Sequence, residues 1–235
     1  MQLKTPYLQH NKHNMHVFEQ LLSAVAPHRC IACGLEGAPL CRPCYQQLPD
    51  PPKCCYKCGK TARQGICADC QEHSSLQSIT VRTLYEGIAE RAVHRLKFER
   101  NRSMAAALAY STADLCPTGV VTHVPTANRR ARQRGYDQAQ LIARLVAEAS
   151  GNPHQTLLRR YGSQRQLGQS RAIRQQQLSD AFCSVFRVAD KRTPVIIVDD
   201  VLTTGATFEA AAKVLHQAGY ETIHALAFAW AAVQN

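Results

Sequence analysis

The chain has 235 residues, 45% of them hydrophobic, so it is long enough to bury one or two cores. Its formal net charge of +11 and pI near 9.3 favour phosphate-rich partners such as nucleotides, nucleic acid or anionic lipid, although a generally basic surface would give the same balance. No stretch approaches the roughly 18–20 consecutive apolar residues of a membrane span, so none is expected.

Residues 1–28 are expected to form a polar segment followed by a short amphipathic helix over 15–26. Glu19 and Gln20 interrupt the apolar pattern of this helix, which Pro27 ends. The pattern is therefore unlike the uninterrupted apolar core of a signal peptide. We expect a cytoplasmic protein in a reducing compartment.

Nine of the 11 cysteines lie between Cys30 and Cys70. Eight of them form two Cys-x-x-Cys pairs separated by seven residues, and then two more separated by eight. Each pair can point two thiolates at one ion, and four thiolates close a tetrahedral zinc site with no open position. The spacing predicts two structural zinc ions in a double zinc-ribbon module over 29–75, with the ligand sets Cys30, Cys33, Cys41, Cys44 and Cys55, Cys58, Cys67, Cys70. A redox dithiol or an iron–sulfur cluster does not explain two consecutive sets, and Cys54 beside Cys55 leaves one ligand open.

Residues 76–235 alternate between strand-like and helix-like patterns. Strands are expected at 80–85, 119–124, 156–158, 181–188, 194–198 and 222–228, and helices at 88–98, 103–115, 138–149 and 207–217. This alternation predicts an α/β domain with a mostly parallel sheet and helices on both faces.

The strongest local signal is the run 195–207. Four apolar residues predict a buried strand, Asp199 and Asp200 stand at its carboxyl end, and a Thr/Gly turn opens a helix. Open α/β proteins bind ligands at this edge of the sheet. Backbone N–H groups and hydroxyls at a helix N-terminus suit a phosphate, while carboxylates suit sugar hydroxyls. The pattern therefore indicates a ribose 5-phosphate site, and no Lys follows Gly205 as a Walker-type loop requires.

This run resembles the motif of type I phosphoribosyltransferases that binds 5-phosphoribosyl-1-pyrophosphate (PRPP). The resemblance implies that Asp199 and Asp200 bind the ribose hydroxyls, and are the catalytic carboxylates if the protein is an active transferase using PRPP with Mg²⁺. It implies that the PRPP-binding run continues through Val201 and Leu202, and that the 5-phosphate is held by Thr203, Thr204, Gly205, Ala206 and Thr207. By the same resemblance, the turn of Pro125, Thr126 and Ala127 is the pyrophosphate loop.

Over about residues 30–230 the chain resembles the ComF/GntX family, a Cys-rich zinc module joined to a phosphoribosyltransferase-like domain. Three further stretches carry this resemblance: Tyr85-Glu86-Gly87 with Leu96-Lys97-Phe98, Val124-Pro125 with Arg132–Gln138, and the segment from Leu158 to Phe182. Asp137 and Gln177 stand where the family pattern usually has Asn. Asp137 adds a carboxylate that could shift a local hydrogen bond, and neither departure is expected to disturb the sugar-phosphate site.

Several basic residues are candidates for binding pyrophosphate or the phosphates of nucleic acid, because guanidinium groups pair with phosphate oxygens in forked geometry. They are Arg129, Arg132, Arg134, Arg171, Arg174 and Lys97. The polar stretch 159–174 predicts a mobile basic loop, which could close over pyrophosphate or follow a nucleic-acid backbone.

Two functions remain open on the sequence. The family resemblance implies a competence protein that binds PRPP and handles single-stranded DNA during natural transformation. Aromatic residues are only 6% of the chain, so DNA binding would depend mainly on phosphate contacts.

The alternative is an active phosphoribosyltransferase with an unidentified acceptor. Thr203 replaces the Asp of hypoxanthine–guanine enzymes, which disfavours purine salvage of that type. The zinc module could also dock a protein partner such as an import helicase.

Overall fold

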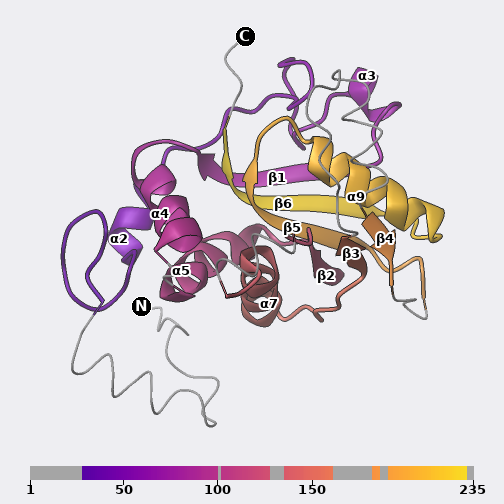
Figure 1. Ribbon diagram of the computed structural model, residues 1–235. Helices are drawn as coiled ribbons and strands as arrows, with labels where there is room; N and C mark the ends of the chain where they lie inside the picture. The colour runs from indigo at the N-terminus through magenta and orange to yellow at the C-terminus, as the bar shows by residue number, and fades with distance from the viewer. Residues whose placement is uncertain (1–27, 100–101, 128–134, 161–181, 186–189, 232–235) are drawn as a thin grey trace, which may run out of the picture.

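The computed structural model describes residues 28–99, 102–127, 135–160, 182–185 and 190–231 (Figure 1). The expected helix over 15–26 lies outside these residues. Within them, no helix combines the length and the apolar character that crossing a bilayer requires.

The centre of the molecule is a four-stranded sheet of β1 (Ser78–Leu84), β2 (Val120–His123), β5 (Val195–Leu202) and β6 (Ile223–Trp230). The strand order is β1-β6-β5-β2, and every neighbouring pair is parallel. The helical segments that connect these strands are amphipathic and pack their apolar sides onto the sheet.

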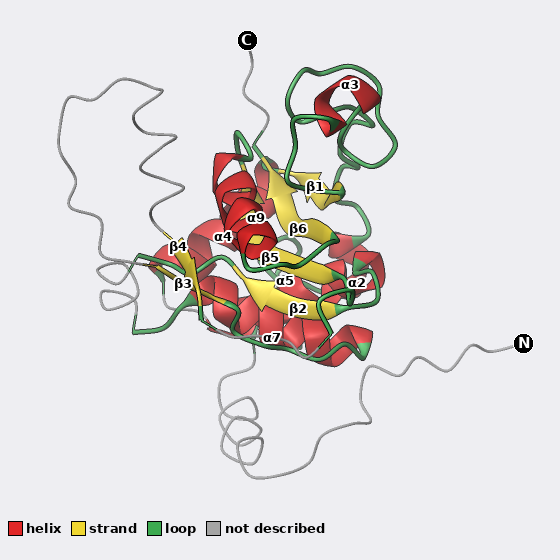
Figure 2. Cartoon of the chain, turned by 90° about the vertical axis from the view of Figure 1, so that its right-hand side faces the viewer, coloured by secondary structure: helices red, strands yellow, loops and turns green. Residues whose placement is uncertain are grey.

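Helices cover both faces of this sheet (Figure 2). One face carries α4 (Gly87–Phe98), α5 (Arg102–Thr112) and α7 (Gln138–Ser150), and the other carries α9 (Ala206–Gln217). Alternating side chains of β5 supply both cores, because successive residues of a strand point to opposite faces. Ile196 and Val198 therefore pack toward α4, α5 and α7, while Val195 and Ile197 pack toward α9.

The Cys-rich part contains two short helices, α2 (Arg42–Tyr45) and α3 (Ala68–Gln71), which lie far apart in Figure 1. The segment with α2 joins the core under α4, α5 and α7 through Cys30, Leu40 and Cys44. The segment with α3 joins the opposite core under α9, through Cys55, Ala62 and Ile66. The predicted fold class, a mostly parallel sheet with helices on both faces and a Cys-rich N-terminal part, is confirmed.

Several predicted elements have different bounds in the structure. Strand β5 continues to Leu202 rather than ending at residue 198, because its ladder with β6 extends to the pair Leu202–Trp230. The expected helix over 103–115 ends at Thr112 and continues as a 3-10 turn over Ala113–Leu115. The expected strands at 156–158 and 181–188 are β3 (Leu158–Arg160) and β4 (Phe182–Ser184), an antiparallel pair apart from the main sheet.

Candidate functional site

The turn between β5 and α9 leads into a helix N-terminus whose N-cap is a glycine. Gly205 is the N-cap of α9 with φ 74°, a left-handed conformation that favours glycine. Lacking a side chain, it cannot cap the first-turn N–H groups of a 12-residue helix. Thr203 and Thr204 are exposed beside these groups. The partial positive charge of the helix N-terminus makes this turn suitable for an anion.

Asp200 is held in place by two side chains from the helices on one face of the sheet. Its side chain is almost fully buried, and Lys97 Nζ lies 2.9 Å from Asp200 Oδ1. Gln138 Nε2 donates a hydrogen bond to Asp200 Oδ2 at 3.2 Å. A buried carboxylate needs such partners, so Lys97 and Gln138 compensate the burial of the Asp200 side chain.

Asp199 is half-buried next to this ion pair, and its Oδ1 accepts a hydrogen bond from the backbone N–H of Asp200 at 2.8 Å. Burial, and then the charge of Asp200, raise the pKa of Asp199 well above its usual range. The two neighbouring carboxylates therefore differ in character, with Asp200 in an ion pair and Asp199 inclined to hold a proton.

The segment 125–127 follows β2 and lies beside the carboxylates. The N–H of Val124 donates to the carbonyl oxygen of Val198 at 3.0 Å, which ties the start of this segment to β5. Asp137, the N-cap of α7, accepts two hydrogen bonds from Thr126, one from its backbone N–H at 2.8 Å and one from its hydroxyl at 2.9 Å. Asp137 also accepts from the N–H of Gln140 at 3.2 Å. The departure at position 137 thus supplies a carboxylate that fastens the expected pyrophosphate loop to α7.

Two groups of four cysteines each bring their sulfur atoms within 4.8 Å of one another, and these groups are the predicted sets. Zn–S bonds of about 2.3 Å in a tetrahedron place sulfur atoms roughly 3.8 Å apart. The Sγ atoms of Cys33 and Cys41 are 3.7 Å apart, and those of Cys58 and Cys67 are 3.5 Å apart. Both groups therefore fit a structural zinc ion. We name the set beginning at Cys30 the first cluster and the set beginning at Cys55 the second cluster.

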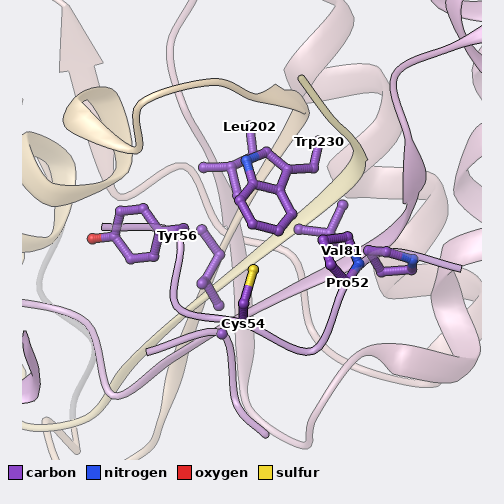
Figure 3. Close-up of a pocket in the computed structure, with 9 residues that line it drawn as sticks. Pro52, Cys54, Tyr56, Val81, Leu202 and Trp230 are labelled. Carbon is purple, nitrogen blue, oxygen red and sulfur yellow. The ribbon is translucent and has the colours of Figure 1, made fainter. Parts of the chain in front are cut away.

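Cys55, not Cys54, belongs to the second cluster. Cys54 lines a small apolar pocket with Tyr56, Leu202 and Trp230, and its sulfur points toward the indole ring (Figure 3). The structure thus assigns Cys55 rather than Cys54 as the ligand that the sequence left open. Only one of the two can face the cluster, because neighbouring side chains of an extended segment point in opposite directions.

The structure brings some of the predicted site residues together and does not describe others. Lys97 meets Asp200, and the segments 125–127 and 199–207 lie at the carboxyl ends of the adjacent strands β2 and β5. Arg129, Arg132, Arg134, Arg171 and Arg174 lie outside the described residues. The sequence patterns gave no role in the site to Gln138 and Asp137, although both fall in a stretch that the family resemblance had singled out.

The fold and this site define an α/β protein with an acidic pair at the end of a buried strand, a glycine-capped helix N-terminus after it, and two four-cysteine clusters. No family model matches the chain. DNA utilization protein YhgH of Salmonella typhimurium is 30% identical over 200 residues, which cover 78% of this chain and 87% of that protein. Competence protein F of Haemophilus influenzae is 28% identical over 218 residues, covering 83% and 93%. The chain belongs to the ComF family, which includes these competence and DNA-utilization proteins.

Two solved structures are similar to part of this chain. A structure described as the allosteric regulatory enzyme of purine biosynthesis matches 58% of this chain at 23% identity, with a TM-score of 0.42. Glutamine PRPP amidotransferase from B. subtilis, complexed with ADP and GMP, matches 58% at 23% identity, with a TM-score of 0.43. The chain spans 30% of the length of each of these two proteins.

Proposed function

We propose that the protein binds PRPP or a closely related ribose phosphate at the carboxyl end of β5 and handles single-stranded DNA in the cytoplasm. The observation that carries the ligand proposal is the acidic pair Asp199–Asp200, which lies just before the glycine-capped N-terminus of α9. Carboxylates accept hydrogen bonds from ribose hydroxyls, and the turn 203–207 offers N–H and hydroxyl donors to the 5-phosphate.

The segment 125–127 is proposed to face the pyrophosphate group, with Arg129, Arg132 and Arg134 following it in the chain. Mg²⁺ bound with PRPP would neutralise pyrophosphate charge. Lys97 is proposed to hold Asp200 until the ribose hydroxyls arrive, because its 2.9 Å contact compensates the buried carboxylate.

Calorimetry of PRPP with Mg²⁺ tests the ligand proposal. We expect binding by the wild type and a loss of at least about tenfold in Asp199→Asn and Asp200→Asn, since each substitution replaces a carboxyl oxygen that is proposed to accept a hydrogen bond from a ribose hydroxyl. Asp114→Asn is the matched control, because Asp114 is exposed and makes only a 3.5 Å ion pair with Arg82 among the contacts of the described residues. Wild-type protein that shows no heat with PRPP would refute the proposal.

The DNA part of the proposal draws on the names of the two relatives, on the net charge of +11 and on the end of α4. Phe98 is 65% exposed there, and its ring centroid lies 4.8 Å from that of His94. An exposed aromatic ring beside basic residues can stack on a base of single-stranded DNA.

Fluorescence anisotropy of a labelled single-stranded oligonucleotide tests this part. We expect affinity to fall steeply with salt, because phosphate contacts release counterions. Phe98→Ala should weaken binding about tenfold while leaving the salt slope unchanged, since stacking involves no counterions. Leu35→Ala, at a residue that is 68% exposed on the first cluster, is the control. Absence of binding at low salt would remove DNA from the proposal.

A further inference from the structure

The second cluster touches the turn 203–207, which we call the phosphate turn because of its proposed ligand. The contact is made by the residues that lie between the first two cysteines of the cluster. Tyr56 places its ring against Gly205, where an added Cβ would lie 2.1 Å from Tyr56 Cε2. Gly205 is thus required for two reasons, its positive φ of 74° and the ring that fills the space beside it. Each Cys-x-x-Cys pair with the residues between its cysteines forms a tight turn, or knuckle. The first knuckle of the second cluster therefore packs directly on the N-cap of α9.

Glu209, in the first turn of α9, receives several polar contacts from the same region. The Tyr56 hydroxyl donates a hydrogen bond to its carboxylate, and Lys57 Nζ lies 2.6 Å from Oε1. Ser74 Oγ donates to Oε1 at 2.7 Å, and the backbone N–H of Ser75 donates to Oε2 at 2.8 Å. The N–H of Glu209 in turn donates to the carbonyl oxygen of Gly205 at 3.0 Å. This network connects both ends of the second cluster to the start of α9.

The network also has an electrostatic consequence. A carboxylate one turn from a phosphate site would repel a phosphate dianion. Lys57 is half-buried against Glu209, with side-chain exposures of 25% and 22%, so its charge compensates that of Glu209 where solvent screens little. Loss of Lys57 from this position would leave an acidic group facing the anion site.

The first cluster has different neighbours. The residues between its first two cysteines, Ile31 and Ala32, pack against the core under α4, α5 and α7. That core lies on the face of the sheet opposite α9. The two clusters thus provide a comparison within one chain, one in contact with the phosphate turn and one on the other face.

We infer that the second cluster is a positioning element of the phosphate turn, and that metal bound by Cys55, Cys58, Cys67 and Cys70 sets the affinity of the turn 203–207 for a sugar phosphate. Metal in the first cluster has no such effect. This inference rests on the proposed ribose-phosphate function for its ligand, but the contact between cluster and turn can be tested without any ligand.

Trp230 is a reporter for that contact. It is the single tryptophan of the chain, and it lies 8% exposed in the pocket lined by Cys54, Tyr56 and Leu202 (Figure 3). If the second cluster opens, water reaches the indole ring and its emission shifts to longer wavelength. Opening of the first cluster leaves Trp230 covered.

The test compares Cys58→Ser with Cys33→Ser. Both residues are exposed second cysteines of the first knuckle of their cluster, so the two substitutions are matched. For each full-length variant we measure bound zinc by mass spectrometry, Trp230 emission, hydrogen exchange of residues 203–209, and PRPP–Mg²⁺ affinity. We expect Cys58→Ser to shift the Trp230 emission to longer wavelength, to raise the exchange rate of residues 203–209 and to weaken PRPP binding at least about tenfold. We expect Cys33→Ser to leave the emission wavelength unchanged, and to leave the exchange rate and the PRPP affinity within about twofold of wild type. Equal behaviour of the two variants would overturn the inference.

Because Cys58→Ser can also weaken binding by unfolding the protein, Tyr56→Phe provides a variant that keeps all eight cluster cysteines. It removes the hydroxyl bonded to Glu209, and we expect about three- to tenfold weaker PRPP binding at unchanged zinc content. Ribose 5-phosphate affinity should fall by the same factor, because the phosphate is the group that the turn holds. Tyr45→Phe, whose ring lies under Arg82 beside the first cluster, should bind like wild type. Unchanged binding in Tyr56→Phe contradicts the inference.

The two proposals fail separately. Wild-type protein without PRPP affinity refutes the ribose-phosphate function, and the emission and exchange measurements then still decide whether the second cluster positions the turn. Wild-type protein that binds PRPP, together with a Cys58→Ser variant that binds it equally well, refutes the positioning role alone.

Discussion

The first and second clusters have almost the same ligand spacing but different surroundings. Ile31 and Ala32 occupy the knuckle of the first cluster and make apolar contacts, whereas Tyr56 and Lys57 occupy the knuckle of the second and make polar contacts to Glu209. Cysteine spacing determines which sulfur atoms meet. The residues between the cysteines determine which part of the fold each cluster stabilises.

One ion pair beside each cluster shows the same contrast. Beside the first cluster, Arg29 and Glu36 are 2.9 Å apart but 73% and 56% exposed. Beside the second, Lys57 and Glu209 are 2.6 Å apart and mostly buried. Solvent screens the first pair and not the second, so only the second can contribute substantially to stability.

Metal removal is the prediction with the largest expected effect. Each cluster forms part of a core, through Cys30 and Cys44 on one face and Cys55 on the other. Structural zinc contributes roughly 10 kcal/mol of apparent binding free energy, so stripping both ions should lower the melting temperature sharply. Calorimetry before and after treatment with a strong chelator, with zinc counted by mass spectrometry, measures this. A melting temperature that does not change in the metal-free protein would contradict it.

Leu40→Ala and Ile66→Ala compare the apolar anchors of the two clusters. Both side chains are buried, Leu40 in the core with the first cluster and Ile66 in the core with the second. Each substitution should lower the free energy of unfolding by about 2–5 kcal/mol. Because the residues lie in cores on opposite faces, the double variant should lose the sum within about 0.5 kcal/mol. Urea unfolding measures all three variants, and a strongly non-additive result would show that the two cores are one energetic unit.

Glu209→Gln examines the polar network at the second cluster, and its effect should depend on pH. Burial would raise the pKa of Glu209, but hydrogen bonds from Lys57, Tyr56 and Ser74 hold it below the usual range. A carboxyl whose pKa is lowered by folding stabilises the native state above its unfolded pKa, and loses that contribution as pH falls through the folded value. We expect a loss of about 1–3 kcal/mol at pH 7 that shrinks below about pH 4. A difference between variant and wild type that is constant with pH would be inconsistent with an ionised Glu209.

Glu36→Gln is the matched substitution at the first cluster and should have the smallest effect. Its ion pair with Arg29 is exposed, so we expect a change in the free energy of unfolding within about 0.5 kcal/mol at pH 7. The same urea experiment measures it. A loss as large as that of Glu209→Gln would remove the contrast between the two ion pairs.

Sequence patterns sufficed for the order of the elements and for the cluster cysteines, apart from the choice between Cys54 and Cys55. The apolar run 195–198 predicted a buried strand, and the Thr/Gly turn after it predicted the start of a helix, within one residue of where α9 begins. The Cys-x-x-Cys pairs predicted which thiols gather, because chelation by a tight knuckle is a local property of the chain. The strand β5 was predicted too short, since its last four residues are held by a ladder with β6 that no local pattern reveals.

Only the tertiary structure decided which residues far apart in the chain meet. It placed Lys97 on Asp200, fastened Thr126 to Asp137, chose Cys55 over Cys54, and put the two clusters on opposite faces of the sheet. These contacts join segments whose separation is set by strand order and helix packing. Periodicity and spacing carry information over a few residues, whereas the meeting of Tyr56 with Gly205 depends on the whole fold between them.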